Sequence, residues 1–166
     1  QFRWAREVAE AMGLCCFADD RYEADDLIGT LASHWRQRGH PLCIVTSDKD
    51  LAQLIEANDT WWDFNRNQKL GHAKIKDKFG VFPGQMADFL ALTGDVVDNI
   101  PGVPGIGPKS AAALLSHFDN LEALWERIEE VPHLSIRGAK SLRQKLAEHR
   151  PAAELARRLT GIETRV

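Results

Sequence analysis

One stretch of the sequence places two acidic residues three positions apart and follows them with a glycine-rich turn: Leu92-Thr93-Gly94-Asp95-Val96-Val97-Asp98-Asn99-Ile100-Pro101-Gly102-Val103-Pro104-Gly105-Ile106-Gly107-Pro108-Lys109-Ser110-Ala111. Glycine admits positive φ and leaves backbone N–H groups uncovered, and Pro108 suits the first position of a helix. The start of that helix adds a positive dipole end beside Lys109. The stretch therefore predicts a binding seat for phosphate groups, made by Gly102, Gly105, Gly107, Lys109 and Ser110.

Two alternatives fit parts of this stretch. Gly102 and Gly107 enclose four residues, as in the G-x-x-x-x-G-K-[ST] loop of nucleotide hydrolases, but Pro108 stands where that loop needs lysine. The preceding residues are acidic and turn-rich, whereas such a loop follows a buried apolar strand. The other alternative is a plain glycine-proline turn between two core helices, and the neighbouring carboxylates argue against it.

The composition limits the class of protein. With 166 residues, 44% of them hydrophobic, the chain fits one domain, or one domain with a distinct lobe. It has no run of eighteen apolar residues and no basic-then-apolar start, so we expect an intracellular, cytoplasmic protein with no membrane partner. Cys15, Cys16 and Cys43 match neither a disulfide framework nor C-x-x-C zinc spacing, and we expect them to be small core residues.

The charge is unevenly distributed. The net charge is −3, but setting aside seven carboxylates for a metal site leaves 17 acids against 21 Lys and Arg. Between residues 137 and 158, only Glu148 and Glu154 oppose seven basic residues: Arg137, Lys140, Arg143, Lys145, Arg150, Arg157 and Arg158. A basic lobe beside an acidic centre is typical of proteins that process phosphodiesters. A solvated helix face is the alternative for this basic run.

Helical and extended patterns alternate over the first 71 residues. Apolar spacing predicts helices over 2–12 and 24–38, and short strands over 14–17 and 42–46. Residues 60–71 predict a strand, a turn and a returning strand, with Trp61 and Trp62 on opposite faces and one of them partly exposed. This alternation favours an α/β fold with a parallel sheet in residues 1–71. From residue 72 to 166 the pattern is that of a helical lobe.

Acidic residues follow the predicted strands, where ligands of parallel sheets bind. Glu23, Asp25 and Asp26 come after the first strand, and Asp48 and Asp50 come after the second. Together with Asp95 and Asp98 they make seven carboxylates, which would repel one another without a cation. Oxygen ligands suit hard divalent ions, so we expect Mg²⁺ or Mn²⁺. Taken singly, Asp25 could be a first-turn acid and Asp48 a cap.

These residues resemble the 5′-nuclease family, which includes the 5′-to-3′ exonuclease domain of bacterial DNA polymerase I, its stand-alone bacterial relatives and the flap endonucleases. The resemblance covers about residues 20 to 160 and is carried by four segments: 22–26, 46–51, 78–81 and 92–111. It implies a PIN-like α/β nuclease core. It also implies a C-terminal helical lobe whose helix-hairpin-helix module, at about residues 95–118, grips the phosphates of duplex DNA.

The same resemblance implies an activity and a site. The expected reaction is hydrolysis of phosphodiesters at 5′ ends or flaps, in DNA replication and repair, by a nucleoid-associated enzyme. Two metal ions would use the seven acids, with Asp25, Asp48, Asp50 and Asp95 at the catalytic centre. We expect duplex shape and phosphate contacts, not base reading, to provide selectivity.

Two further expectations concern the partner segments of this chain and the alternative to a catalytic function. The resemblance implies that the chain corresponds to the C-terminal part of such a nuclease. The expected partners are therefore an N-terminal segment, which carries the first strand and a helical arch in family members, or a polymerase domain. The alternative class is a non-catalytic helix-hairpin-helix module with structural carboxylates. Binding alone does not require Asp48 and Asp50 together with Asp95 and Asp98, which favours the nuclease.

Overall fold

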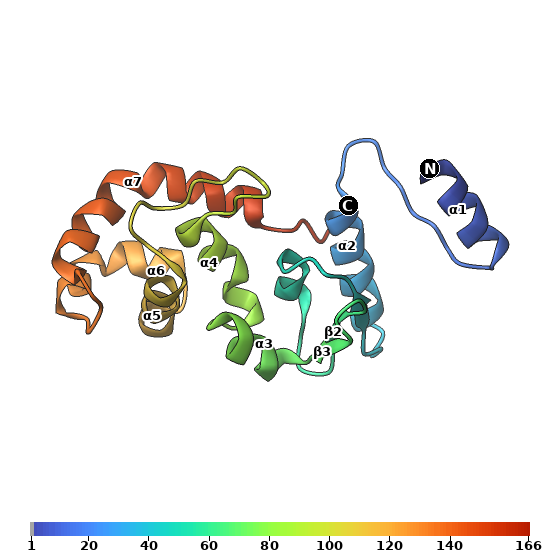
Figure 1. Cartoon of the computed structure of the whole chain (residues 1–166), viewed down its shortest axis with the longest axis horizontal. Coiled ribbons are helices and arrows are strands. Elements are labelled where there is room, and N and C mark those ends of the chain that lie inside the picture. Colours follow the sequence, from blue (N-terminus) through green and yellow to red (C-terminus); the bar gives the residue numbers. More distant parts are fainter. Residues whose placement is uncertain (1) are drawn as a thin grey trace.

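The structure is a computed structural model, and it describes residues 2–166 (Figure 1). Helices and strands are labelled α and β, and short 3₁₀ helices are labelled η. In chain order the elements are α1 (Phe2–Ala11), α2 (Ala24–Arg36), β1 (Cys43–Val45), η1 (Asp50–Leu54), β2 (Thr60–Asp63), β3 (Gln68–Leu70), α3 (His72–Phe79), η2 (Pro83–Gln85), α4 (Met86–Thr93), α5 (Pro108–Phe118), α6 (Leu121–Glu126), η3 (Ile128–His133) and α7 (Ala139–Thr160).

The sheet is small and mixed. Its order is β1-β2-β3, with β1 and β2 parallel and β2 and β3 antiparallel. The parallel pairing of β1 with β2 agrees with the predicted α/β pattern. The antiparallel β3 is the predicted returning strand, which a short turn joins to β2. Trp61 is buried opposite Ile44 and Leu70, whereas Trp62 is half-buried, which confirms the expected alternation of these two rings.

Helix α4 is the centre of the hydrophobic core. Seven of its eight residues are buried, six of them apolar, and the seventh, Asp88, pairs with Arg157 of α7. It packs against η1, α5 and α7, and Thr160 Oγ1 at the end of α7 donates a 3.0 Å hydrogen bond to the carbonyl of Ala87. One buried cluster runs from Ile44 in β1 to Ala156 in α7. The strands all precede residue 71, and the division at residue 71 stays a prediction.

The predicted strand over 14–17 is wrong. Leu14 and Phe17 are exposed in an irregular segment, because no described strand lies beside them to complete a ladder of hydrogen bonds. The preceding helix is confirmed as α1, but its apolar residues Val8 and, just beyond its end, Met12 are exposed. Figure 1 shows α1 standing apart from the other helices. The side chain of Phe2 lies outside what the structure describes.

The prediction of core cysteines is also wrong. Cys15 and Cys43 are exposed and Cys16 is only partly covered. In β1 the side chains alternate, so that Ile44 points into the core while Cys43 and Val45 point away from it. Among the helices of residues 2–166, none combines the length and the apolar character that a membrane crossing requires.

Candidate metal centre and nucleic-acid interface

A tight turn after β1 positions Asp48 and Asp50. Thr46 Oγ1 accepts a 3.0 Å hydrogen bond from the N–H of Asp48, and Asp48 Oδ1 accepts one of 2.9 Å from the N–H of Asp50. The indole of Trp61, buried in β2, donates a 2.8 Å hydrogen bond to the carbonyl of Asp48. The sheet therefore fixes the turn, and Asp50 begins η1.

A second turn after α4 positions Asp95 and Asp98. Asp95 and Ile100 exchange two backbone hydrogen bonds of 2.8 and 2.7 Å, which close a tight loop between them. Asp95 Oδ1 accepts a 2.9 Å hydrogen bond from the N–H of Val97. The loop leaves Asp95 buried and Asp98 exposed at its end.

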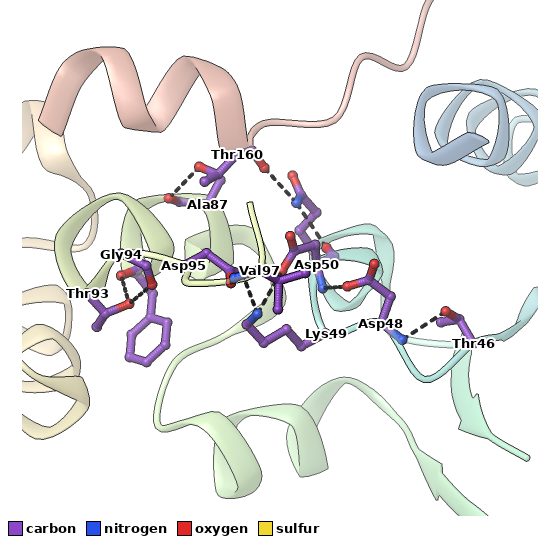
Figure 2. A network of polar contacts seen from close by, with 12 residues as sticks. Thr46, Asp48, Lys49, Asp50, Ala87, Thr93, Gly94, Asp95, Val97 and Thr160 are labelled. Atoms are coloured by element: carbon purple, nitrogen blue, oxygen red, sulfur yellow. Dashed lines mark hydrogen bonds and ion pairs between the residues drawn. The ribbon is translucent and has the colours of Figure 1, made fainter. Parts of the chain in front are cut away.

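The two turns meet. Asp50, Asp95 and Asp98 each offer an oxygen within 4.8 Å of the others, although the two segments are more than 40 positions apart. Figure 2 shows Asp50 and Asp95 of this group, with Asp48 and Lys49 beside them. Spacing in the sequence predicted these acids as ligands, and the tertiary structure brings them together.

Two adjoining cavities surround these acids. The first, of about 480 Å³, is lined by Asp48, Asp50, Asp95 and Asp98 together with the basic side chains of Lys49, Arg66 and Lys78. The second, of about 760 Å³, is lined by six of the seven predicted acids: Glu23, Asp25, Asp26, Asp48, Asp50 and Asp98. The predicted acids from all three segments therefore occupy one region, in which Asp95 lines the first cavity only.

Electrostatics confirm that this region is crowded with negative charge. Burial raises the pKa of Asp25, and nearby carboxylates raise it further: Asp48, Glu23, Asp26 and Asp98. Burial also raises the pKa of Asp50 to about 6, which Lys49 opposes and the neighbouring acids reinforce. Groups with raised pKa values beside like charges are typical of functional sites.

Asp26 has a structural role of its own. One of its oxygens accepts a 3.3 Å hydrogen bond from the N–H of Glu23 at the start of α2, and the other accepts one of 2.9 Å from the N–H of Glu163. Both carboxylate oxygens are therefore engaged by backbone. Burial first, and then the surrounding carboxylates, raise the pKa of its neighbour Asp25.

Lys49 pairs with the buried acids. Its Nζ donates to Asp95 Oδ2 and lies 3.7 Å from Asp50 Oδ1. Burial works against ionisation of Asp95, but the hydrogen bonds from Lys49 and Val97 lower its pKa. The sequence reasoning missed this residue, although its place between two predicted ligands was a usable signal. Arg66 and Lys78, which line the first cavity, were not predicted either, and Arg158 of the second cavity was predicted only as part of the basic run.

The donor set fits a hard divalent cation. Asp50 Oδ1 is buried and accepts no hydrogen bond from any of residues 2–166, and its charge is met only by the Lys49 ammonium 3.7 Å away. The surrounding donors are all carboxylates, which are ligands that Mg²⁺ and Mn²⁺ prefer. Asp48, Asp50, Asp95 and Asp98 could hold one ion, and Glu23 and Asp25 could contribute to another.

The predicted phosphate seat is divided between surface and interior. Gly105, Gly107 and Lys109 are exposed, and Ser110 is partly covered at the start of α5. Gly102 is buried, and a Cβ there would lie 2.4 Å from the backbone nitrogen of Gly94. Gly102 therefore packs inside the hairpin against the backbone of Gly94 and is not part of the exposed surface.

The basic run of residues 137–158 is partly neutralised within the chain. Three of its members pair with acids: Arg143 with Glu129, Arg150 with Glu154 and Arg157 with the buried Asp88. Lys145 reaches the hairpin, where its Nζ lies 2.6 Å from the place that a Cβ of Gly105 would take. It adds a positive charge to the exposed part of the seat.

Two family models together match the whole chain. Residues 1–80 match the family model described as the 5'-3' exonuclease N-terminal resolvase-like domain, and residues 81–166 match the 5'-3' exonuclease C-terminal SAM fold. The chain is 46% identical over 157 residues to DNA polymerase I of Pseudomonas aeruginosa, covering 94% of this chain and 17% of that protein. It is 40% identical over 159 residues to flap endonuclease Xni of Cronobacter sakazakii, covering 96% and 61%.

Solved structures show the same fold. The T5 5'-exonuclease with bound zinc aligns with a TM-score of 0.82 at 20% identity, over 98% of this chain and 59% of that one. A T5 D15 flap endonuclease in a pseudo-enzyme-product complex with DNA and metal ions aligns with a TM-score of 0.79 at 19% identity, over 99% and 58%. The chain thus spans less than two thirds of these relatives. With both family models matched along its length, it belongs to the 5'-3' exonuclease family.

Proposed function

We propose that this chain supplies metal-binding and phosphate-binding parts of a nuclease that hydrolyses DNA phosphodiesters at 5′ ends or flaps, in replication and repair. The observation that carries the proposal is the meeting of Asp50, Asp95 and Asp98 within 4.8 Å, directly before a glycine-rich hairpin that leads into α5. The names of the relatives, a DNA polymerase I and a flap endonuclease, support it.

The carboxylates are assigned to two divalent ions, Mg²⁺ or Mn²⁺. Asp48, Asp50, Asp95 and Asp98 would hold one, and Glu23 and Asp25 would contribute to the other, with Asp26 anchoring the start of α2. When bound, such ions lower the pKa of a water and offset the charge on phosphorus. The chain itself holds the carboxylates in place through the Asp48 turn and the Asp95–Ile100 loop.

The hairpin is assigned to the DNA backbone. Gly105 and Gly107 expose main chain, and the helix that begins at Pro108 presents its N-terminal end beside Lys109. Phosphate oxygens are the groups that such a terminus binds. Contacts of this kind orient a duplex without reading its sequence, so we expect shape and ends to select the substrate.

One observation favours a second candidate, a DNA-binding module without catalysis. Several of the acids have partners within the chain: Lys49 pairs with Asp95, and both oxygens of Asp26 accept backbone hydrogen bonds. Carboxylates with such partners can serve folding alone. The buried Oδ1 of Asp50, which accepts no hydrogen bond from the described residues, favours the nuclease.

A chimera separates the two candidates. This chain would replace the matched 61% of the Cronobacter sakazakii flap endonuclease Xni, and cleavage of a labelled 5′-flap DNA would be followed with Mg²⁺ or Mn²⁺. We expect the chimera to cut, its Asp95→Ala variant to bind DNA without cutting, and an exposed-acid control, Glu148→Ala, to cut normally. The chain alone should bind the flap but cut it poorly. A chimera that binds DNA and stays inert would establish the binding module instead.

A further inference from the structure

Lys49 lies among the carboxylates that would bind the metal. Its Nζ donates to Asp95 Oδ2 and is 3.7 Å from Asp50 Oδ1 (Figure 2). These acids are two of the three whose oxygens converge within 4.8 Å. The ammonium group therefore occupies the side of the site where a divalent ion would find its oxygens.

Three of the four carboxylate oxygens of Asp95 and Asp50 bear on how an ion would bind. Asp95 Oδ1 accepts from the N–H of Val97, and Oδ2 accepts from Lys49. Asp50 Oδ1 is buried with no hydrogen bond from the described residues, and its nearest cation is the same ammonium. An ion that takes Asp95 Oδ2 and Asp50 Oδ1 must therefore share or replace the contacts of Lys49.

The geometry allows the ammonium group to leave. The Lys49 side chain is 38% exposed and lines the 480 Å³ cavity, so a rotamer change brings its Nζ into water. The Asp95 side chain is only 4% exposed and stays behind. A buried carboxylate without a cation is costly, so one cation has to replace the other.

We propose that Lys49 is the counter-cation of the metal-free site and that a divalent ion binds by displacing its ammonium group from Asp95 and Asp50. The inference rests on the proposed metal site and extends it to how that site is filled. Lys49 stabilises the metal-free protein and, by the same contacts, weakens metal binding. Lys78 lines the same cavity but donates to Gln68 and not to these acids, which makes it a matched control.

The test measures Mn²⁺ affinity of this chain by titration calorimetry in wild type, Lys49→Met and Lys78→Met. Removing a positive charge a few Å from the ion should lower the Kd of Lys49→Met about tenfold, whereas Lys78→Met should stay within about twofold. The metal-free Tm of Lys49→Met should fall, and its rise on adding Mn²⁺ should exceed that of wild type. Lys49→Arg, which keeps the charge, should show no gain in affinity.

A second measurement uses the wild-type protein and so does not depend on a variant folding. In ¹⁵N NMR, the NH₃⁺ signal of Lys49 should shift on saturation with Mg²⁺, and that of Lys78 should not. Equal Kd values for wild type and Lys49→Met, or an unmoved Lys49 signal at saturation, would overturn the displacement while leaving the metal site standing. If the wild type binds no Mn²⁺, both the metal site and the displacement fail.

Discussion

Gly94 and Gly102 approach so closely that a Cβ on Gly102 would lie 2.4 Å from the backbone nitrogen of Gly94. Gly102 also has a φ of +66°, a region that favours glycine. The contact joins the end of α4 to the far side of the hairpin, and it is supported by the 2.8 Å hydrogen bond from the N–H of Val103 to the carbonyl of Leu92. The positions of Asp95 and Asp98 depend on this closure.

Gly102→Ala should therefore destabilise the protein. Backbone atoms cannot move aside as a flexible side chain does, so we expect a loss of at least about 2 kcal/mol in the free energy of unfolding. Urea denaturation followed by circular dichroism measures it. The control is Gly84→Ala, since a Cβ there meets nothing within 4 Å and its φ is not positive. Equal stability of the two variants would contradict the closure.

Metal affinity should depend on pH through Asp50. Burial first, and then the neighbouring acids against the opposing Lys49, raise the pKa of this carboxyl to about 6 in the metal-free protein. Below that pH a proton occupies the group and the ion has to displace it, so Mn²⁺ affinity should fall up to about tenfold per pH unit below 6 and level off above it. Calorimetry between pH 5 and 8 checks this, with Asp50→Ala losing most of the affinity at every pH. A flat profile would remove Asp50 from the ligand set.

Duplex binding should be governed by phosphates. Lys109→Ala should weaken binding to all sequences alike, and the slope of log K against log salt should become shallower by about one unit. Fluorescence anisotropy with duplexes of different sequence measures both effects. Lys74→Ala, an exposed lysine of α3, is the control and should leave the slope unchanged. A strong preference for one sequence would contradict the assignment of the hairpin.

Asp59 should be a major stabilising residue away from the site. Burial disfavours its charge, but Arg36 and the backbone N–H groups of Glu56 and Leu42 donate to it and lower its pKa. The pKa of Asp59 is therefore lower in the folded protein than its ordinary value of 3.8. The stabilisation that Asp59 provides is fully present at pH values above this ordinary pKa, and it is lost as the pH falls through the pKa of the folded protein.

Asp59→Ala should therefore cost roughly 2–4 kcal/mol at pH 7, since it leaves Arg36 without its buried partner. Denaturation at pH 7 and pH 3 measures both the loss and its decrease in acid. Glu56→Ala removes an exposed ion pair with the same arginine and should cost under about 1 kcal/mol. If the two variants lose equal stability, the buried pair is not the stabilising contact.

Local sequence patterns were enough to predict most of the acids that the structure brings together in the candidate metal centre. The spacing of Asp95 and Asp98, the glycines that follow them and the helix that begins at Pro108 are short-range features, because φ preferences and helix starts act within a few residues. The segments that contain Asp25, Asp48 and Asp50 were found in the same way. The resemblance to the 5′-nuclease family depends on these segments, and the matched family models confirm it.

Long-range packing decided which partners the charged residues meet and which residues are buried. Lys49 pairs with Asp95 across 46 positions, and Asp26 accepts a hydrogen bond from the N–H of Glu163 across 137. Gly102 is buried because α4 ends against it, and the apolar residues of 14–17 are exposed because no described strand pairs with them. A residue's neighbours in sequence set its backbone conformation, but the charge partner it meets, and whether water reaches it, depend on segments that only the folded chain brings together.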